Sequence, residues 1–182
     1  MQIYLVGIRN WTLNTDYKEI DLIDGDTVVY NYETVAAALD NAVYNSVRTN
    51  NTGEDIVENG ITYSLVLDSK TAIRVYFRPT DGYEGKFVVT LDGESYTPKT
   101  VGGRYLVEIT GIAAHELGVK HIIEVTTANG SAHVEVSALT YVNDMLNAKT
   151  GTTQAETDAK NAVCSIYEYY KAADDYKKAN PQ

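Results

Sequence analysis

The spacing of the apolar residues changes near residue 137, and this change constrains the fold more than any other feature of the chain. From Ile61 to Val136 the apolar residues mostly alternate with polar ones, which is typical of half-buried strands. From Ser137 onward they recur every three or four residues, which is the spacing of amphipathic helices. The sequence therefore predicts a β-sandwich followed by a helical hairpin.

Turn signals divide the alternating block into short strands. Asp92-Gly93, Gly102-Gly103 and Asn129-Gly130 are dipeptides that tolerate the positive φ angles of two-residue hairpin turns. Residues 112–117 are expected to form a short helical crossing between strands. Short strands with a turn about every 8–12 residues are typical of a sandwich. The expected strands cover residues 61–67, 73–77, 87–91, 95–97, 105–109, 122–127 and 132–136.

The first 59 residues are predicted to contain strands and one helix. Residues 2–9 favour a strand, and residues 16–32 favour a hairpin around Asp24-Gly25. Residues 33–47 place Val35, Leu39 and further apolar residues on one helical face. Residues 48–59 are polar and rich in turn formers, so a loop is expected there.

The tail is predicted to hold two helices, one over residues 139–146 and one from residue 154 to about residue 180. Ser137 is the expected N-cap of the first helix, and Ile166 lies on the apolar stripe of the second. The fold class is therefore α+β. We expect an N-terminal strand and helix segment (1–59), an immunoglobulin-like antiparallel β-sandwich (60–136) and a C-terminal helical hairpin (137–182), packed as one unit.

The charge of the chain disfavours one class of partner. Its 25 acidic and 15 basic residues give a net charge of −10, and an acidic field repels phosphate backbones, so no nucleic-acid partner is expected. No run of 18 apolar residues occurs, so no membrane insertion is expected. The single cysteine, Cys164, is expected to pack as a small apolar residue within its helix.

No motif for catalysis, cofactor binding or metal binding is recognised. His115 and His121 lie six residues apart, whereas a zinc protease helix needs two histidines four residues apart. Asp21, Asp24 and Asp26 surround a glycine but lack the glutamate of an EF-hand loop. A charged turn is the preferred interpretation, and a looser calcium site stays open. Paired carboxylates for glycoside hydrolysis also stay open, because spatial neighbours cannot be read from the sequence.

Tyrosine is the most unusual component of the chain, with 15 Tyr against 2 Phe and 1 Trp. A tyrosine ring suits positions where one end is dry and the other is wet, as at binding surfaces. Tyr83 lies in a loop flanked by glycines and is the residue most expected to be exposed. The predicted ligand-binding residues are Tyr83, Tyr96, Tyr32 and Trp11, of which Trp11 is expected to be half-buried.

About two-thirds of the chain, residues 63–179, carries a resemblance to a known kind of domain. Its residues include Ile112, Ala114 and Leu117, together with five segments: 64–77 (SLVLDSKTAIRVYF), 89–93 (VTLDG), 105–109 (YLVEI), 136–142 (VSALTYV) and 166–176 (IYEYYKAADDY). This combination resembles a β-sandwich domain with a C-terminal helix found in large secreted or wall-attached proteins of gut Firmicutes. The resemblance implies an extracellular, cell-surface, non-catalytic module that neighbours other domains of a larger protein.

The expected function is therefore binding, with a host protein such as immunoglobulin as the ligand. A carbohydrate-binding module that uses Tyr83, Tyr96 or Trp11 to stack on sugars is the first alternative. A structural spacer without a ligand is the second alternative. The resemblance transfers no catalytic residue to this chain.

Overall fold

The computed structural model describes residues 32–39, 44–45, 47–68 and 70–181. These residues fall into two compact units that do not follow chain order. One unit comprises Ser46–Ala113 and Gly118–Tyr141, and we call it the sandwich unit. The other comprises Ala114–Leu117 and Val142–Gln182 with the described part of Met1–Asn45, and we call it the helical unit.

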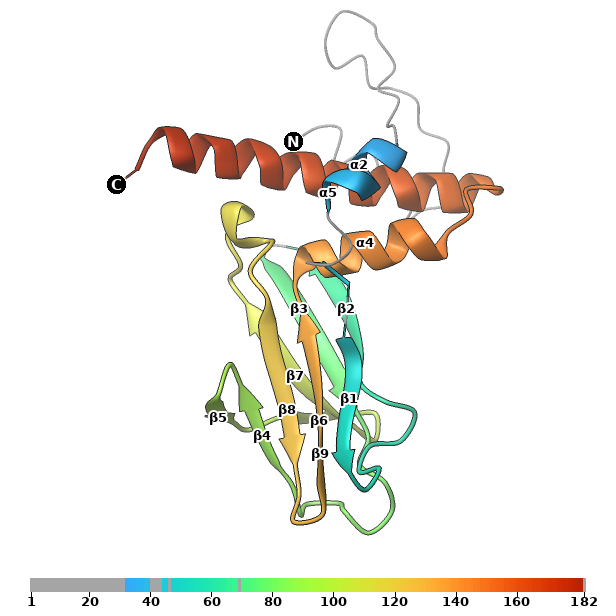
Figure 1. The fold of residues 1–182 in the computed structure, drawn as a ribbon, viewed down its shortest axis with the longest axis vertical. Helices are drawn as coiled ribbons and strands as arrows, with labels where there is room; N and C mark the ends of the chain where they lie inside the picture. The colour runs from blue at the N-terminus through green and yellow to red at the C-terminus, as the bar shows by residue number, and fades with distance from the viewer. Residues whose placement is uncertain (1–31, 40–43, 46, 69, 182) are drawn as a thin grey trace, which may run out of the picture. The chain divides into compact units, whose positions relative to one another are not determined.

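The sandwich unit is built from two antiparallel sheets (Figure 1). The five-stranded sheet has the order β1 (Val47–Gly53), β9 (Gly130–Val136), β8 (His121–Thr126), β4 (Val88–Leu91) and β5 (Glu94–Tyr96). The four-stranded sheet has the order β2 (Thr62–Leu67), β3 (Thr71–Phe77), β7 (Arg104–Thr110) and β6 (Lys99–Val101). The predicted α+β class with an antiparallel sandwich is confirmed.

The core of the sandwich unit explains the alternation in the sequence. Ile73, Val75 and Phe77 of β3 are buried, and they pack in one cluster with residues of the facing sheet such as Ile123 and Val134. Successive residues of a strand point to opposite faces, so the residues between them lie on the outer face. Burial of these alternating apolar side chains provides the main stabilisation of the sandwich.

Two predictions for the sandwich unit are wrong. The loop expected over residues 48–59 is a strand up to Gly53, because β1 pairs with β9 at the sheet edge and needs no alternating apolar pattern there. β8 and β9 pair around Asn129-Gly130 as expected, but these two residues do not adopt the positive φ angles predicted for their turn. Gly130 is instead required because the end of β1 and the residue after it pass so close that a Cβ atom would lie 2.8 Å from the Thr52 carbonyl oxygen and 2.6 Å from the Glu54 carbonyl oxygen.

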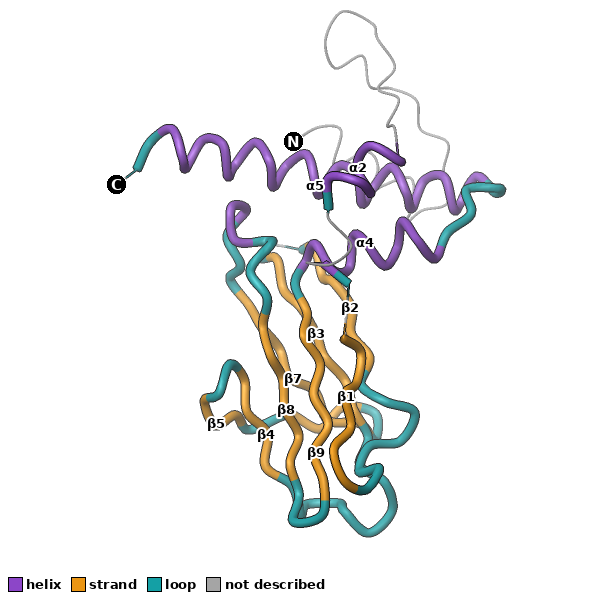
Figure 2. The backbone as a smooth tube through the Cα atoms, in the orientation of Figure 1, coloured by secondary structure: helices purple, strands orange, loops and turns teal. Residues whose placement is uncertain are grey.

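Helices make up most of the described helical unit, and Figure 2 draws them in purple. α2 (Tyr32–Ala38) and the long α5 (Gln154–Ala179) belong to this unit, and a 3₁₀ turn, η1 (Ala114–Glu116), contacts α5. α4 (Ala138–Ala148) begins in the sandwich unit and ends in the helical unit. Ser137 caps α4 as predicted, since its hydroxyl oxygen accepts a hydrogen bond of 3.0 Å from the Thr140 amide.

Two hydrogen bonds at the start of α5 explain why this helix begins where it does. The Thr153 hydroxyl accepts a hydrogen bond from the Glu156 amide at 3.2 Å, and the Glu156 carboxylate accepts one from the Thr152 amide at 3.2 Å. Buried residues on one face of α5 include Ala159, Ala162 and Ile166. The apolar stripe predicted from the sequence is therefore present.

The N-terminal predictions are tested only in part. α2 confirms a helix from residue 33 with Val35 buried, but Val47 begins β1 instead of ending that helix. The strand expected over residues 2–9 and the hairpin around Asp24-Gly25 lie outside the described residues. In the described part of the chain, no helix is long and apolar enough to cross a membrane.

Candidate functional site

The loops at one end of the sandwich unit form an open recess that contains one of the predicted binding residues. These loops follow β1, β3 and β8 and gather at the same end of the two sheets (Figure 2). The recess has a volume of about 500 Å³. We call it the loop-end recess, and its lining residues are Glu54, Asp81, Gly82, Tyr83, Lys86, Thr127, Ala128 and Asn129.

Two successive turns place Tyr83 at the recess. The Thr80 carbonyl accepts a hydrogen bond from the Tyr83 amide, and the Tyr83 carbonyl accepts one from the Lys86 amide, each at 3.0 Å. Gly82 and Gly85 occupy the third position of these turns with φ angles of 94° and 68°. That conformation favours glycine, so the glycines that flank Tyr83 in the sequence set its position.

The loop that carries Tyr83 is tied to the chain before β2. The Thr80 amide donates to the Ile56 carbonyl at 2.9 Å, and the Thr80 hydroxyl donates to the Asp55 carbonyl at 3.0 Å. Val57 and Pro79 form an isolated antiparallel bridge beside these bonds. These contacts hold one wall of the loop-end recess in place before any ligand binds.

The phenol of Tyr83 is fixed by two side chains from other loops. Its hydroxyl donates to the Glu54 carboxylate, and the Asn129 amide donates to the Tyr83 hydroxyl at 3.1 Å. The hydrogen bond to Glu54 raises the pKa of Tyr83 above its ordinary value, because the protonated phenol is the form that donates it. Glu54, Tyr83 and Asn129 therefore join three loops in one hydrogen-bonded group.

The exposed residues around this group carry mixed charges. Asp81 and Lys86 are exposed at the rim, and Glu54 contributes a second carboxylate. A partly buried ring surrounded by exposed polar groups is a common arrangement at protein-binding surfaces. The recess therefore offers an aromatic contact together with hydrogen-bond donors and acceptors.

Tyr96 has a structural contact within the sandwich unit. Its hydroxyl accepts a hydrogen bond from the Glu108 amide at 3.2 Å and donates to the Glu108 carbonyl at 3.4 Å. β6 pairs with β7 only as far as Leu106. At Glu108 the Tyr96 hydroxyl therefore supplies the hydrogen bonds that the backbone of a neighbouring strand would otherwise make. Tyr96 belongs to the five-stranded sheet and Glu108 to the other, so the contact links the two sheets.

The two remaining predicted binding residues are Tyr32 and Trp11, and neither is among the described residues of the sandwich unit. Tyr32 lies in α2, where its hydroxyl donates to the Asn161 side-chain oxygen at 2.7 Å and the Lys160 ammonium lies 5.1 Å from its ring centre. Burial raises the pKa of Tyr32. These contacts connect α2 to α5 within the helical unit. Trp11 lies outside the described residues. The structure thus brings neither Tyr96 nor Tyr32 to the loop-end recess.

The histidines and the cysteine have separate environments. His115 in η1 lies 3.4 Å from the Lys177 ammonium, and the His121 ring donates a hydrogen bond of 2.8 Å to the Asp92 carboxylate. Among the described residues, no group of three His, Cys, Asp or Glu side chains is placed to hold a metal ion.

Burial raises the pKa of the Cys164 thiol to about 12, which keeps it in the unreactive thiol form. Asp21, Asp24 and Asp26 lie outside the described residues.

Sequence reasoning missed the partners of Tyr83 and a second recess. Glu54 lies in a predicted loop and Asn129 in a predicted turn. Nothing in the sequence around either residue indicates that its side chain bonds to Tyr83. Arg78 and Arg104 line a smaller cleft on the four-stranded sheet. The signal for Arg78 was available, because alternation places it with Arg74 and Tyr76 on the face opposite Ile73, Val75 and Phe77.

Comparison with known proteins adds no relative: no family model matches the chain, and searches of curated proteins and of solved structures give no significant match.

Proposed function

We propose that this chain is a non-catalytic binding module of a bacterial cell-surface protein and that it binds a host protein through the loop-end recess. The observation that carries the proposal is the hydrogen-bonded group of Glu54, Tyr83 and Asn129, which presents an aromatic ring at the meeting point of three loops. Loops on a rigid sandwich are a frequent location for binding residues.

The form of the recess favours a protein ligand over a small molecule. Small-molecule sites are usually enclosed and mostly apolar, whereas this recess is open and has charged residues at its rim. A tyrosine held in one position loses little side-chain freedom on binding, which is why tyrosine is common among the residues that dominate binding energy. Asp81 and Lys86 supply charges of both signs for a polar rim.

Immunoglobulin is the first ligand to test. The resemblance of residues 63–179 to a domain of secreted and wall-attached proteins of gut Firmicutes supports the cell-surface setting. Such a setting brings the module into contact with mucosal and serum proteins. The net charge of −10 favours partners with a basic surface, since complementary charge increases the rate of association.

The experiment is a titration of purified human immunoglobulin A and immunoglobulin G over the immobilised 182-residue chain. The proposal predicts saturable binding to at least one of them. It also predicts that Tyr83→Ala and the rim variant Lys86→Glu each weaken that binding about tenfold or more, which corresponds to about 1.4 kcal/mol. Tyr176→Ala is the matched control, because Tyr176 is 72% exposed on α5 and lies outside the recess.

Three results would contradict the proposal. The first is equal binding by the parent chain and by both recess variants, which would place the contact elsewhere. The second is binding to a glycan array through Tyr83 with no protein ligand, which would favour the carbohydrate-binding alternative. The third is the absence of any ligand among immunoglobulins, mucosal glycoproteins and glycans, which would favour a spacer. Lys86→Glu keeps the test valid if Tyr83→Ala does not fold, because Lys86 is exposed.

A further inference from the structure

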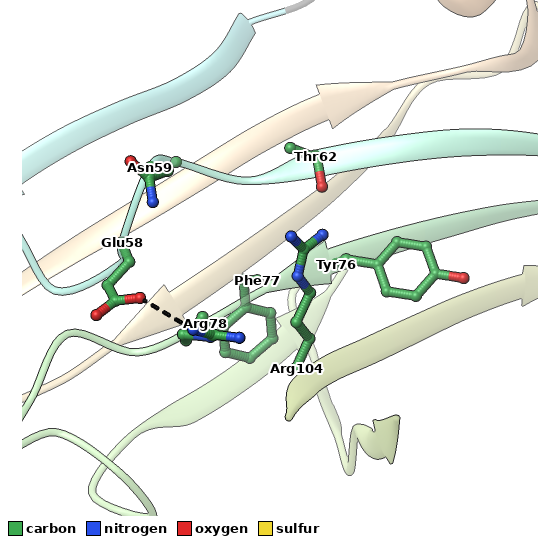
Figure 3. A pocket seen from close by; sticks show the side chains of 8 residues that line it. Glu58, Asn59, Thr62, Tyr76, Phe77, Arg78 and Arg104 are labelled. Carbon is green, nitrogen blue, oxygen red and sulfur yellow. Dashed lines mark ion pairs between the residues drawn. The ribbon is translucent and has the colours of Figure 1, made fainter. Parts of the chain in front are cut away.

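The outer face of the four-stranded sheet carries a second recess, which is distinct from the loop-end recess. Its volume is about 100 Å³. Figure 3 shows its polar side chains, with the Arg104 side chain reaching toward Thr62 and the Tyr76 ring beside it. We call it the arginine cleft, and its lining residues are Glu58, Asn59, Gly60, Thr62, Tyr76, Phe77, Arg78 and Arg104.

Strand geometry brings the two arginines together. Tyr76 and Arg78 are two residues apart on one face of β3 and its continuation, and Arg104 begins β7. β3 and β7 are antiparallel neighbours in which Phe77 is opposite Tyr105. Arg78 follows Phe77 and Arg104 precedes Tyr105, so the register places the two arginines next to each other. The clustering follows from the strand register and does not depend on a flexible loop.

The wall of the cleft opposite the strands is a constrained turn. Asn59 and Gly60 have φ angles of 54° and 74°, and a Cβ atom on Gly60 would lie 2.9 Å from the Thr49 hydroxyl oxygen. The Glu58 amide donates to the Arg78 carbonyl at 2.8 Å, and the Ile61 amide donates to the Thr49 hydroxyl at 3.0 Å. The cleft is therefore held open by backbone geometry.

The positive charge of the cleft is only partly neutralised. Arg78 pairs loosely with Glu58 at 3.6 Å, and the Arg104 guanidinium has no ion-pair or hydrogen-bond partner among the described residues. On the same face, Glu108 is already paired with Arg74 at 2.7 Å and with Lys99 at 3.1 Å. A chain with net charge −10 thus gathers two guanidinium groups and one carboxylate at one small recess.

We propose that the arginine cleft binds the carboxylate or sulfate group of an acidic sugar. A guanidinium binds such a group through two parallel hydrogen bonds, and Arg104 is available to do so. The cleft is small, with a volume of about 100 Å³, which suits one acidic group with the rest of the saccharide lying outside it.

The neighbouring groups favour a sugar over an acidic peptide. The Tyr76 ring beside Arg104 offers a flat surface on which a sugar ring stacks (Figure 3). The Asn59 amide and the Thr62 hydroxyl supply a donor and an acceptor for sugar hydroxyls. The site therefore combines a charge anchor, a stacking surface and neutral hydrogen-bonding groups within one turn and two strands.

The test uses three sugars that share one neutral core. The 182-residue chain is titrated with 3′-sialyllactose, 3′-sulfolactose and lactose, and binding is followed by the amide NMR signals of residues 58–62, 76–78 and 104. The two acidic sugars distinguish carboxylate from sulfate recognition. The proposal predicts that at least one acidic sugar shifts these signals, that lactose does not, and that the affinity falls as the salt concentration rises.

Single substitutions connect the binding to the cleft. Arg104→Gln is expected to weaken binding of the acidic sugar about tenfold or more, with the chain still folded because Arg104 is exposed. Arg104→Lys keeps the charge but loses the two-pronged geometry, so an intermediate affinity is expected. Arg74→Gln is the matched control, since it removes an arginine from the same face but outside the cleft.

Several outcomes would overturn this inference. Equal signal changes with lactose would show that the acidic group is not recognised. An unchanged affinity in Arg104→Gln, or an equal loss in Arg74→Gln, would exclude the cleft as the site. Binding of hexaglutamate at these signals, with no response to either acidic sugar, would favour an acidic peptide. Tyr83→Ala separates this site from the proposed protein-binding function, because it should leave the affinity for the acidic sugar unchanged.

Discussion

At the scale of single residues, the tyrosines of this chain have different roles that depend on where their hydroxyl groups point. Tyr96 bonds to a peptide group of the opposite sheet, and Tyr32 connects two helices. Tyr83 instead bonds to two loop side chains at an open recess. The sequence shows only that each of them lies near a turn. Their hydrogen-bond partners lie 12 to 129 residues away and cannot be read from local patterns.

Replacement of Tyr96 tests its structural role. Tyr96→Phe removes the hydroxyl that satisfies both the amide and the carbonyl of Glu108. We expect the free energy of unfolding in urea to fall by about 1–2 kcal/mol, because a partly buried peptide group loses its partner. Tyr176→Phe, at a position 72% exposed, should leave the unfolding midpoint unchanged. Equal midpoints for the two variants would contradict the assigned role.

Glu108 gives a pH-dependent contribution with a defined sign. Its hydrogen bond with Arg74, and then that with Lys99, lowers the pKa of the carboxyl below the ordinary value of 4.5. The stability that the charged form provides is therefore present above pH 4.5 and is lost as the pH falls through the lowered pKa. In a carboxyl NMR titration, Glu108 should titrate below 4.5, and Arg74→Gln should raise its pKa. A parent value at or above 4.5 would refute this ion-pair assignment.

At the scale of secondary-structure elements, the predictions succeeded where one face of an element is buried. The alternating residues of β3 and β7 and the apolar stripe of α5 were all recognisable. Asp92 and Gly93 adopt the positive φ angles, 53° and 85°, that their turn signal predicts. β1 was missed because an edge strand of sequence VRTNNTG is defined by its pairing with β9 and not by its own pattern.

The buried face of α5 allows a direct test by substitution. Ile166 is 1% exposed, so Ile166→Asp places a charged side chain in the buried core beside α5. We expect a loss of about 3 kcal/mol or more in the free energy of unfolding. Ala172→Asp introduces the same charge at an exposed position of α5 and should cost less than about 1 kcal/mol. A thermal midpoint for Ile166→Asp equal to that of the parent would contradict the observed face.

At the scale of the whole molecule, the sequence predicted the class of the fold better than it predicted the site. The change of apolar period near residue 137 is a local property, so it correctly separated strands from helices. The loop-end recess depends on three loops that contribute Glu54, Tyr83 and Asn129 from distant positions. Only Tyr83 had a local signal, its two flanking glycines. The arginine cleft likewise depends on the register between β3 and β7.

The most direct test of the proposed function is amide hydrogen exchange of the 182-residue chain with and without saturating immunoglobulin, read by mass spectrometry. Binding of the ligand at the loop-end recess predicts slower exchange in residues 53–55, 80–86 and 127–130, which carry the residues that line it. It predicts unchanged exchange in the segment around Arg104, because that cleft is a separate site. Protection confined to segments outside the recess, or no protection at saturating concentration, would contradict the claim that these loops bind the protein ligand.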